Sequence, residues 1–120
     1  MQYSEMKQIL LTLTDPADKL DAVIEFGHQI PAVPHTALCT EISGCASRAE
    51  ICRDGNNFYG RADSELVRGI IAILTAMVDG KSPDDIKKMN LEHEFMSLNL
   101  ALGTGRLGGV NSMIRFLQNL

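Results

Sequence analysis

The stretch that most constrains the fold is "DSELVRGIIAILTAMVDG", residues 63 to 80. Asp63 or Ser64 can cap a helix at its start, and Gly80 can close it. Apolar residues nearly encircle this helix and leave only a narrow polar stripe of Glu65, Arg68, Thr75 and Asp79. Such a pattern predicts a buried central helix with the rest of the chain packed around it. The apolar run from Ile70 to Val78 is too short to span a membrane.

Helical patterns also lie on both sides of this stretch. Apolar spacing predicts a helix over 3–13 and a second within 14–30, which Thr14 or Asp15 can cap. After the central helix, Ser82 can cap a short helix, residues 91–102 are expected to form another, and a last helix ends at Leu120. "GTGRLGGV", residues 103 to 110, is expected to separate the last two. The inner face of the last helix is expected to consist of Leu107, Val110, Met113 or Ile114, and Leu117.

Residues 37–60 have a different pattern. "TALCTEI" alternates roughly with period two, "SRAEICR" is compatible with a strand, "DGNN" favours a turn, and "FYG" begins a third strand. We therefore predict an α+β fold in which a small three-stranded antiparallel sheet is flanked by helices. The 120 residues are expected to form one domain, 1–120.

Composition excludes several classes of function. The net charge is −4, and the chain has two tyrosines, four phenylalanines and no tryptophan. These features argue against a nucleic-acid surface, which needs clustered Lys and Arg and aromatic rings for stacking. The segment "MQYSEMKQIL" lacks the pattern of a signal peptide, so we expect a cytoplasmic protein whose thiols are reduced.

Cys45 is the leading candidate for chemistry. It stands in "EISGCASRAE", directly after Gly44, between the first two predicted strands. A glycine lets the chain turn sharply, so the thiol is expected at a loop tip, where reactive groups often lie. The alternative interpretation is an inert cysteine buried in a tight turn.

Two other sites can be drawn from the same residues. Cys39 and Cys52, six residues before and seven after Cys45, could join it and His35 in a metal or iron–sulfur cluster site. Metal ligands are usually closer in sequence, so Cys39 and Cys52 are expected instead to point into the sheet as small apolar residues.

A cysteine hydrolase is the third possibility, in which a histidine would activate Cys45. His28, His35 and His93 are the candidates, each on or near a predicted helix, and nothing in the sequence places one beside Cys45.

Taken together, the motifs resemble the SufE family, the sulfur-acceptor proteins of iron–sulfur cluster assembly. The pattern is "GCASR", then "GRADSELVRGIIAIL", then "SPDDI" and "LNLALGTGRLGGVNSMIR", and it covers roughly residues 14–117. The resemblance implies a small antiparallel sheet flanked by helices, a fold similar to that of IscU-type cluster scaffolds.

The resemblance also implies a role for each matching residue. Cys45 would take sulfane sulfur from a pyridoxal-phosphate-dependent cysteine desulfurase of the SufS or CsdA type, and pass it to a SufBCD-like scaffold. Gly44 and Ser47 match the loop around that cysteine, and Asp63 and Arg106 match residues that open the central and last helices. Such a protein needs no cofactor of its own, and it acts as a sulfurtransferase-type acceptor with its partner, rather than as a stand-alone enzyme.

The reactive species of a sulfur acceptor is the thiolate. Arg48 and Arg106 are the candidate positive charges for stabilising it. The sequence departs from the family at Ala49 and Glu50, where members usually carry a bulky apolar and aromatic pair, and at Gly105, where a serine is usual. These departures are expected to alter the docking surface beside the loop.

Overall fold

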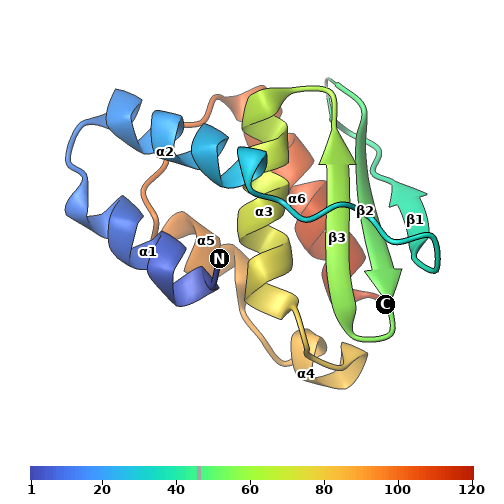
Figure 1. The fold of residues 1–120 in the computed structure, drawn as a ribbon. Coiled ribbons are helices and arrows are strands. Elements are labelled where there is room, and N and C mark those ends of the chain that lie inside the picture. Colours follow the sequence, from blue (N-terminus) through green and yellow to red (C-terminus); the bar gives the residue numbers. More distant parts are fainter. Residues whose placement is uncertain (46) are drawn as a thin grey trace.

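The computed structural model describes residues 1–45 and 47–120. In these residues the elements are α1 (Tyr3–Thr12), α2 (Pro16–His28), β1 (Leu38–Glu41), β2 (Ala49–Asp54), β3 (Asn57–Ala62), α3 (Glu65–Val78), α4 (Pro83–Lys87), α5 (Leu91–Met96) and α6 (Thr104–Gln118). The strands form one antiparallel sheet in the order β1-β2-β3. Figure 1 shows α3 in the middle of the molecule, between α1 and α2 on one side and the sheet on the other. The predicted α+β class is confirmed.

Helix α3 is the buried central helix that the sequence predicts. The Ser64 hydroxyl caps it by accepting a hydrogen bond from the backbone N–H of Val67. The expected polar stripe is wrong at Thr75, which is buried; its hydroxyl donates to the carbonyl of Ile71 at 2.7 Å. A hydrogen bond within the helix therefore satisfies this hydroxyl, so it can face the core.

Two close backbone contacts hold α3 against its neighbours. A Cβ added at Gly69 would lie 2.0 Å from the carbonyl oxygen of Val23 in α2. A Cβ added at Gly60 in β3 would lie 2.3 Å from Cγ2 of Ile71. Side chains at these two positions would force α3 away from both α2 and the sheet, so the glycines set the spacing of the layers.

The sheet is a hairpin meander. Strand β2 pairs with β1 on one side and β3 on the other, and Ile51 in its centre is buried. The segment 29–37, which joins α2 to β1, crosses in front of β3 on its way to the edge of the sheet (Figure 1). This crossing covers part of the sheet and leaves a cavity beside it.

Helix caps elsewhere agree with the sequence. Asp15 caps α2 by accepting from the backbone of Ala17, and Ser82 caps α4 by accepting from Asp85. None of the helices in the described ranges is both long enough and apolar enough to cross a membrane.

Two helix boundaries differ from the prediction. Helix α5 ends at Met96 instead of continuing to residue 102, because Asn99 adopts a left-handed conformation with φ of 55°. Helix α6 begins at Thr104, so most of the predicted separator "GTGRLGGV" is helical. The separator is therefore shorter than predicted, while Val110, Met113 and Leu117, which are expected on the inner face of the last helix, are buried.

The expectation for Cys39 and Cys52 is also wrong. The two residues are partners in the β1–β2 register, and a disulfide joins them across a Cα–Cα distance of 4.0 Å. Cys52 is buried as predicted, but neither sulfur is a thiol in this structure. The antiparallel register makes this pairing possible, because directly opposed side chains lie on the same face of the sheet.

Candidate functional site

The loop between β1 and β2 presents Cys45. A backbone hydrogen bond from Ile42 N–H to the Ala49 carbonyl, 2.9 Å long, closes the base of this loop. Gly44 has φ of +86°, a conformation that favours glycine, and a Cβ there would lie 2.8 Å from the Ser112 hydroxyl of α6. The glycine thus turns the chain and lets it approach α6, which confirms the sequence prediction that Gly44 permits a sharp turn before Cys45.

The Cys45 side chain lies against the N-terminal half of α6. A Cβ built on Gly109 would be only 3.1 Å from its sulfur. Cys45 also lines a cavity of about 400 Å³ whose apolar wall comes from α3 and α6. The apolar residues of that wall are Val67, Ile70, Val110 and Met113. A half-buried cysteine beside a mainly apolar hollow is sheltered from water and has space next to its sulfur for one more atom.

Burial makes the ionisation of this thiol less favourable. Burial raises the pKa of Cys45 above its ordinary value, since a thiolate is less stable away from water. Arg48, the other predicted cation, does not line the Cys45 cavity in this structure, and its guanidinium lies 3.9 Å from Glu41 and 3.6 Å from Glu50. The side chain of Arg106 lines the Cys45 cavity and stays the candidate cation.

The structure divides the sequence-predicted residues into two groups. Ser47 and Arg106 line the same cavity as Cys45. Arg48 and Asp63 line a smaller neighbouring cavity, and the Asp63 N–H donates to the Arg48 carbonyl at 3.1 Å. These two residues therefore brace the end of the loop and do not touch the thiol cavity.

The alternative metal or cluster site is not assembled. Among the described residues, the group with ligand atoms within 4.8 Å of one another consists of Cys39, Glu50 and Cys52, and it includes neither Cys45 nor His35. Its two sulfurs are bonded to each other. The predicted set Cys39, Cys45, Cys52 and His35 thus has no common centre.

The hydrolase alternative fails on geometry as well. In the part of the chain that the structure describes, no histidine lines the cavity of Cys45. The imidazole of His28 lies instead 3.3 Å from Glu65 and 3.4 Å from Glu25. Among the described residues, none of the three candidate histidines is therefore placed to activate Cys45.

Sequence reasoning missed the contribution of α6 to the site. Gly109 lies against the Cys45 sulfur, and Met113 lines the cavity beside it. Only Met113 has the helical spacing that predicts a side chain facing the core. Gly109 stands in "GTGRLGGV", the stretch that the sequence predicts to separate two helices. A glycine pair inside a helix gives no sign of which member faces a neighbouring loop.

The fold and the site together define a class: a small α+β domain that presents a free cysteine on a loop, against a helix and beside a mainly apolar cavity. The family model "SufE: Fe-S metabolism associated domain" matches residues 4–120, so the chain belongs to the SufE family. The predicted family is therefore confirmed.

Individual relatives agree with this assignment. The chain is 29% identical over 117 residues to the sulfur acceptor protein CsdE of Escherichia coli (strain K12), covering 90% of this chain and 80% of CsdE. It is 29% identical over 114 residues to an uncharacterised SufE-like protein of Rhizobium meliloti (strain 1021), covering 85% of this chain and 81% of that protein.

A solved structure supports the fold alone. The solution structure of a hypothetical protein from Thermus thermophilus superimposes with a TM-score of 0.67 at 16% identity. The alignment covers 97% of this chain and 90% of the other. The arrangement of helices and sheet is thus shared with a protein of quite different sequence.

Proposed function

We propose that this protein is a sulfur acceptor that takes sulfur from a cysteine desulfurase onto Cys45 and passes it to an iron–sulfur cluster assembly scaffold. The observation that carries the proposal is the position of Cys45, the free cysteine of the chain, on a loop whose thiol lies beside an apolar cavity. Membership of the SufE family and similarity to the sulfur acceptor protein CsdE support the same role.

As it leaves the cavity, the Cys45 thiol first loses its proton to water or to a basic group of the donor, which gives the reactive thiolate. The Cys45 thiolate attacks the terminal sulfur of the persulfide on the desulfurase cysteine. The sulfur–sulfur bond in the donor breaks, its cysteine leaves as a thiolate, and the terminal sulfur with its proton is now bonded to Cys45. The donor recovers its thiolate for the next turnover, which explains how an acceptor would stimulate it.

The resting position of Cys45 suits this chemistry. Within the cavity the raised pKa keeps the sulfur protonated and protects it from oxidation, because the thiolate is the form that oxidants attack. On docking, the loop would carry the sulfur out of the cavity and into the donor's active site. Arg106 lines that cavity and would favour the thiolate as it leaves.

After docking, the cavity of about 400 Å³ can shelter the loaded persulfide during transit. The recipient would be a SufBCD-like scaffold and the donor a pyridoxal-phosphate enzyme of the SufS or CsdA type. We place this exchange in the cytoplasm, where thiols are kept reduced and the Cys39–Cys52 pair would be open to reduction.

The proposal is tested by intact mass. The purified protein is incubated with a cysteine desulfurase, cysteine and pyridoxal phosphate, and we expect its mass to increase by one sulfur atom. Cys45→Ser should abolish both this increase and the stimulation of the desulfurase. The double variant Cys39→Ser, Cys52→Ser is the matched control and should still load one sulfur. A Cys45→Ser protein that loads sulfur and stimulates the donor would overturn the proposal.

A further inference from the structure

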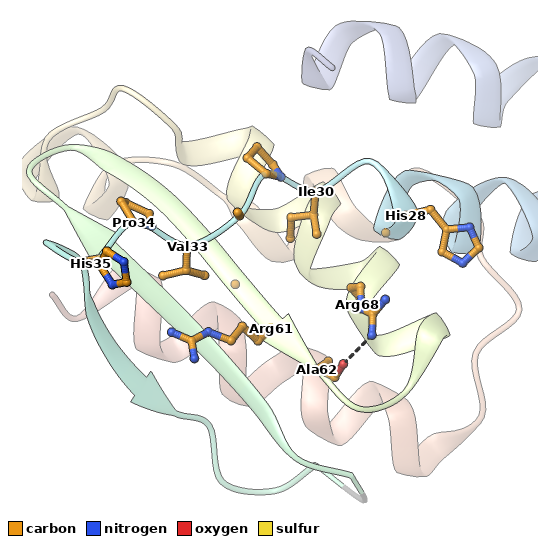
Figure 2. A pocket seen from close by; sticks show the side chains of 13 residues that line it. His28, Ile30, Val33, Pro34, His35, Arg61, Ala62 and Arg68 are labelled. Carbon is orange, nitrogen blue, oxygen red and sulfur yellow. Dashed lines mark hydrogen bonds between the residues drawn. The ribbon is translucent and has the colours of Figure 1, made fainter.

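A second and larger cavity lies away from Cys45. Its volume is about 730 Å³, and no residue that lines it also lines the Cys45 cavity. Figure 2 shows it bordered by the segment that carries Val33, Pro34 and His35 on one side and by Arg61, Ala62 and Arg68 on the other. The proposed sulfur transfer makes no use of this cavity.

The polar side chains of this cavity carry cationic or potentially cationic groups. Arg61 and Arg68 line it together with His28 and His35, and its lining contains no carboxylate. This is an unusual concentration in a protein whose net charge is −4. The rest of the wall is small and apolar, and Pro31 and Pro34 stiffen it because proline fixes its own φ.

The two arginines retain free hydrogen-bonding capacity. Neither guanidinium lies within 4.0 Å of a carboxylate of any residue that the structure describes. Arg68 donates one hydrogen bond, 3.1 Å long, to the Ala62 carbonyl, which fixes its position, as the dashed line in Figure 2 shows. Arg61 contacts the Cys39 sulfur at 3.4 Å. A guanidinium has five N–H donors, so each arginine can still bind a ligand.

The nearby acids are already engaged. Glu50 is the partner of Arg61 in the β2–β3 register, but its carboxylate lies 3.6 Å from Arg48. Glu25 and Glu65 lie beside His28, outside the cavity lining. Arg61 also lines the smaller cavity that Glu50 and Asp63 line, but no carboxylate of a described residue forms an ion pair with Arg61 or Arg68.

We infer that this cavity binds an oxyanion group, a phosphate or a carboxylate, on a small molecule with a compact apolar body. Arg61 and Arg68 hold the anion, because guanidinium donors match the geometry of both groups. The apolar wall that includes Val33 and Pro34 contacts the remainder of the ligand. Such a division, a few charged groups in an otherwise apolar hollow, is typical of small-molecule sites.

The test is an NMR titration of the full-length protein with inorganic phosphate and, separately, with citrate, at constant ionic strength. We expect saturable shifts confined to amides of the cavity lining, such as Ala62 and Val33, for at least one probe, and the stronger probe identifies the group. Arg61→Gln should weaken binding about tenfold or more, the usual effect of losing one charge-assisted hydrogen bond.

Arg115→Gln makes the same change of charge at an exposed position of α6, outside this cavity, and should leave the affinity unchanged. Cys45→Ser should also bind normally, so failure of the sulfur-acceptor role and failure of this site can be told apart. Shifts that do not saturate, or equal weakening by Arg61→Gln and Arg115→Gln, would overturn the proposal.

Discussion

The contact between Cys45 and α6 can be tested with adjacent glycines of one helix. Gly108→Ala and Gly109→Ala each replace a glycine within α6, where alanine stabilises a helix by about 0.5–1 kcal/mol. A Cβ at Gly108 meets nothing within 4 Å, whereas a Cβ at Gly109 lies 3.1 Å from the Cys45 sulfur. The two variants therefore share the helix effect and differ in the contact with the thiol.

Crowding at Gly109 should move the sulfur and leave the helix in place, because the sulfur is the end of a side chain on a loop. Overpacking by one carbon costs about 1 kcal/mol at the low end of its usual range. A cost of that size shifts the balance between the sheltered and the exposed thiol about fivefold. Burial raises the pKa of Cys45, so a thiol that spends more time exposed also ionises more readily.

The assay is the rate at which iodoacetamide alkylates Cys45 at neutral pH, followed by mass spectrometry of its peptide. We expect Gly109→Ala to react about fivefold faster than the unaltered protein and Gly108→Ala to react at the unaltered rate. Urea unfolding of both variants checks that the fold is retained. Equal alkylation rates in the two variants would show that the sulfur does not rest against α6.

Two further predictions concern stability. Gly69→Ala should lower the free energy of unfolding by about 2–3 kcal/mol, because its Cβ would lie 2.0 Å from the carbonyl oxygen of Val23. This cost should exceed the gain from the better helix propensity of alanine. An unchanged or raised midpoint in a urea titration would contradict this packing. Hydrogen bonds from Lys7 and Tyr3 hold the pKa of Glu94 below its usual value. The ionised Glu94 carboxylate therefore stabilises the fold above the ordinary carboxyl pKa, and this contribution is lost as the pH falls through the lowered pKa of Glu94. Glu94→Gln should therefore reduce the acid-dependent loss of stability by about 1 kcal/mol or less, the usual size for a partly exposed ion pair. Identical pH dependence of the urea midpoint in the two proteins, below the ordinary carboxyl pKa, would refute the assignment.

The parts of the fold that the sequence predicts correctly are those specified by neighbouring residues. Ser64 and Ser82 cap the helices they precede, because a capping side chain bonds to a backbone N–H only three residues ahead. The central helix is also specified by its own residues, since its apolar side chains would need burial in any fold. The β2–β3 hairpin follows from the turn at Gly55, whose φ is +62°.

The parts that the sequence predicts wrongly depend on contacts between distant segments. The glycines of residues 103–110 have low helix propensity, and on local grounds they favour a linker. The helix nevertheless begins at Thr104, with Val110 and Met113 buried. The Cys45 loop lies against it, with Gly44 close to Ser112 and Cys45 close to Gly109. No feature of either segment taken separately indicates that the two meet.

The cysteines show the same limit for the site. Cys39, Cys45 and Cys52 are almost evenly spaced along the chain, so spacing does not indicate which of them is the functional residue. Only the glycine before Cys45 distinguishes it from the other two. Register decides the outcome: β1 and β2 pair so that Cys39 faces Cys52, while Cys45 falls in the loop that joins them. A shift of one residue would put the two paired cysteines on opposite faces of the sheet. The register therefore leaves one cysteine of the three unpaired at the loop.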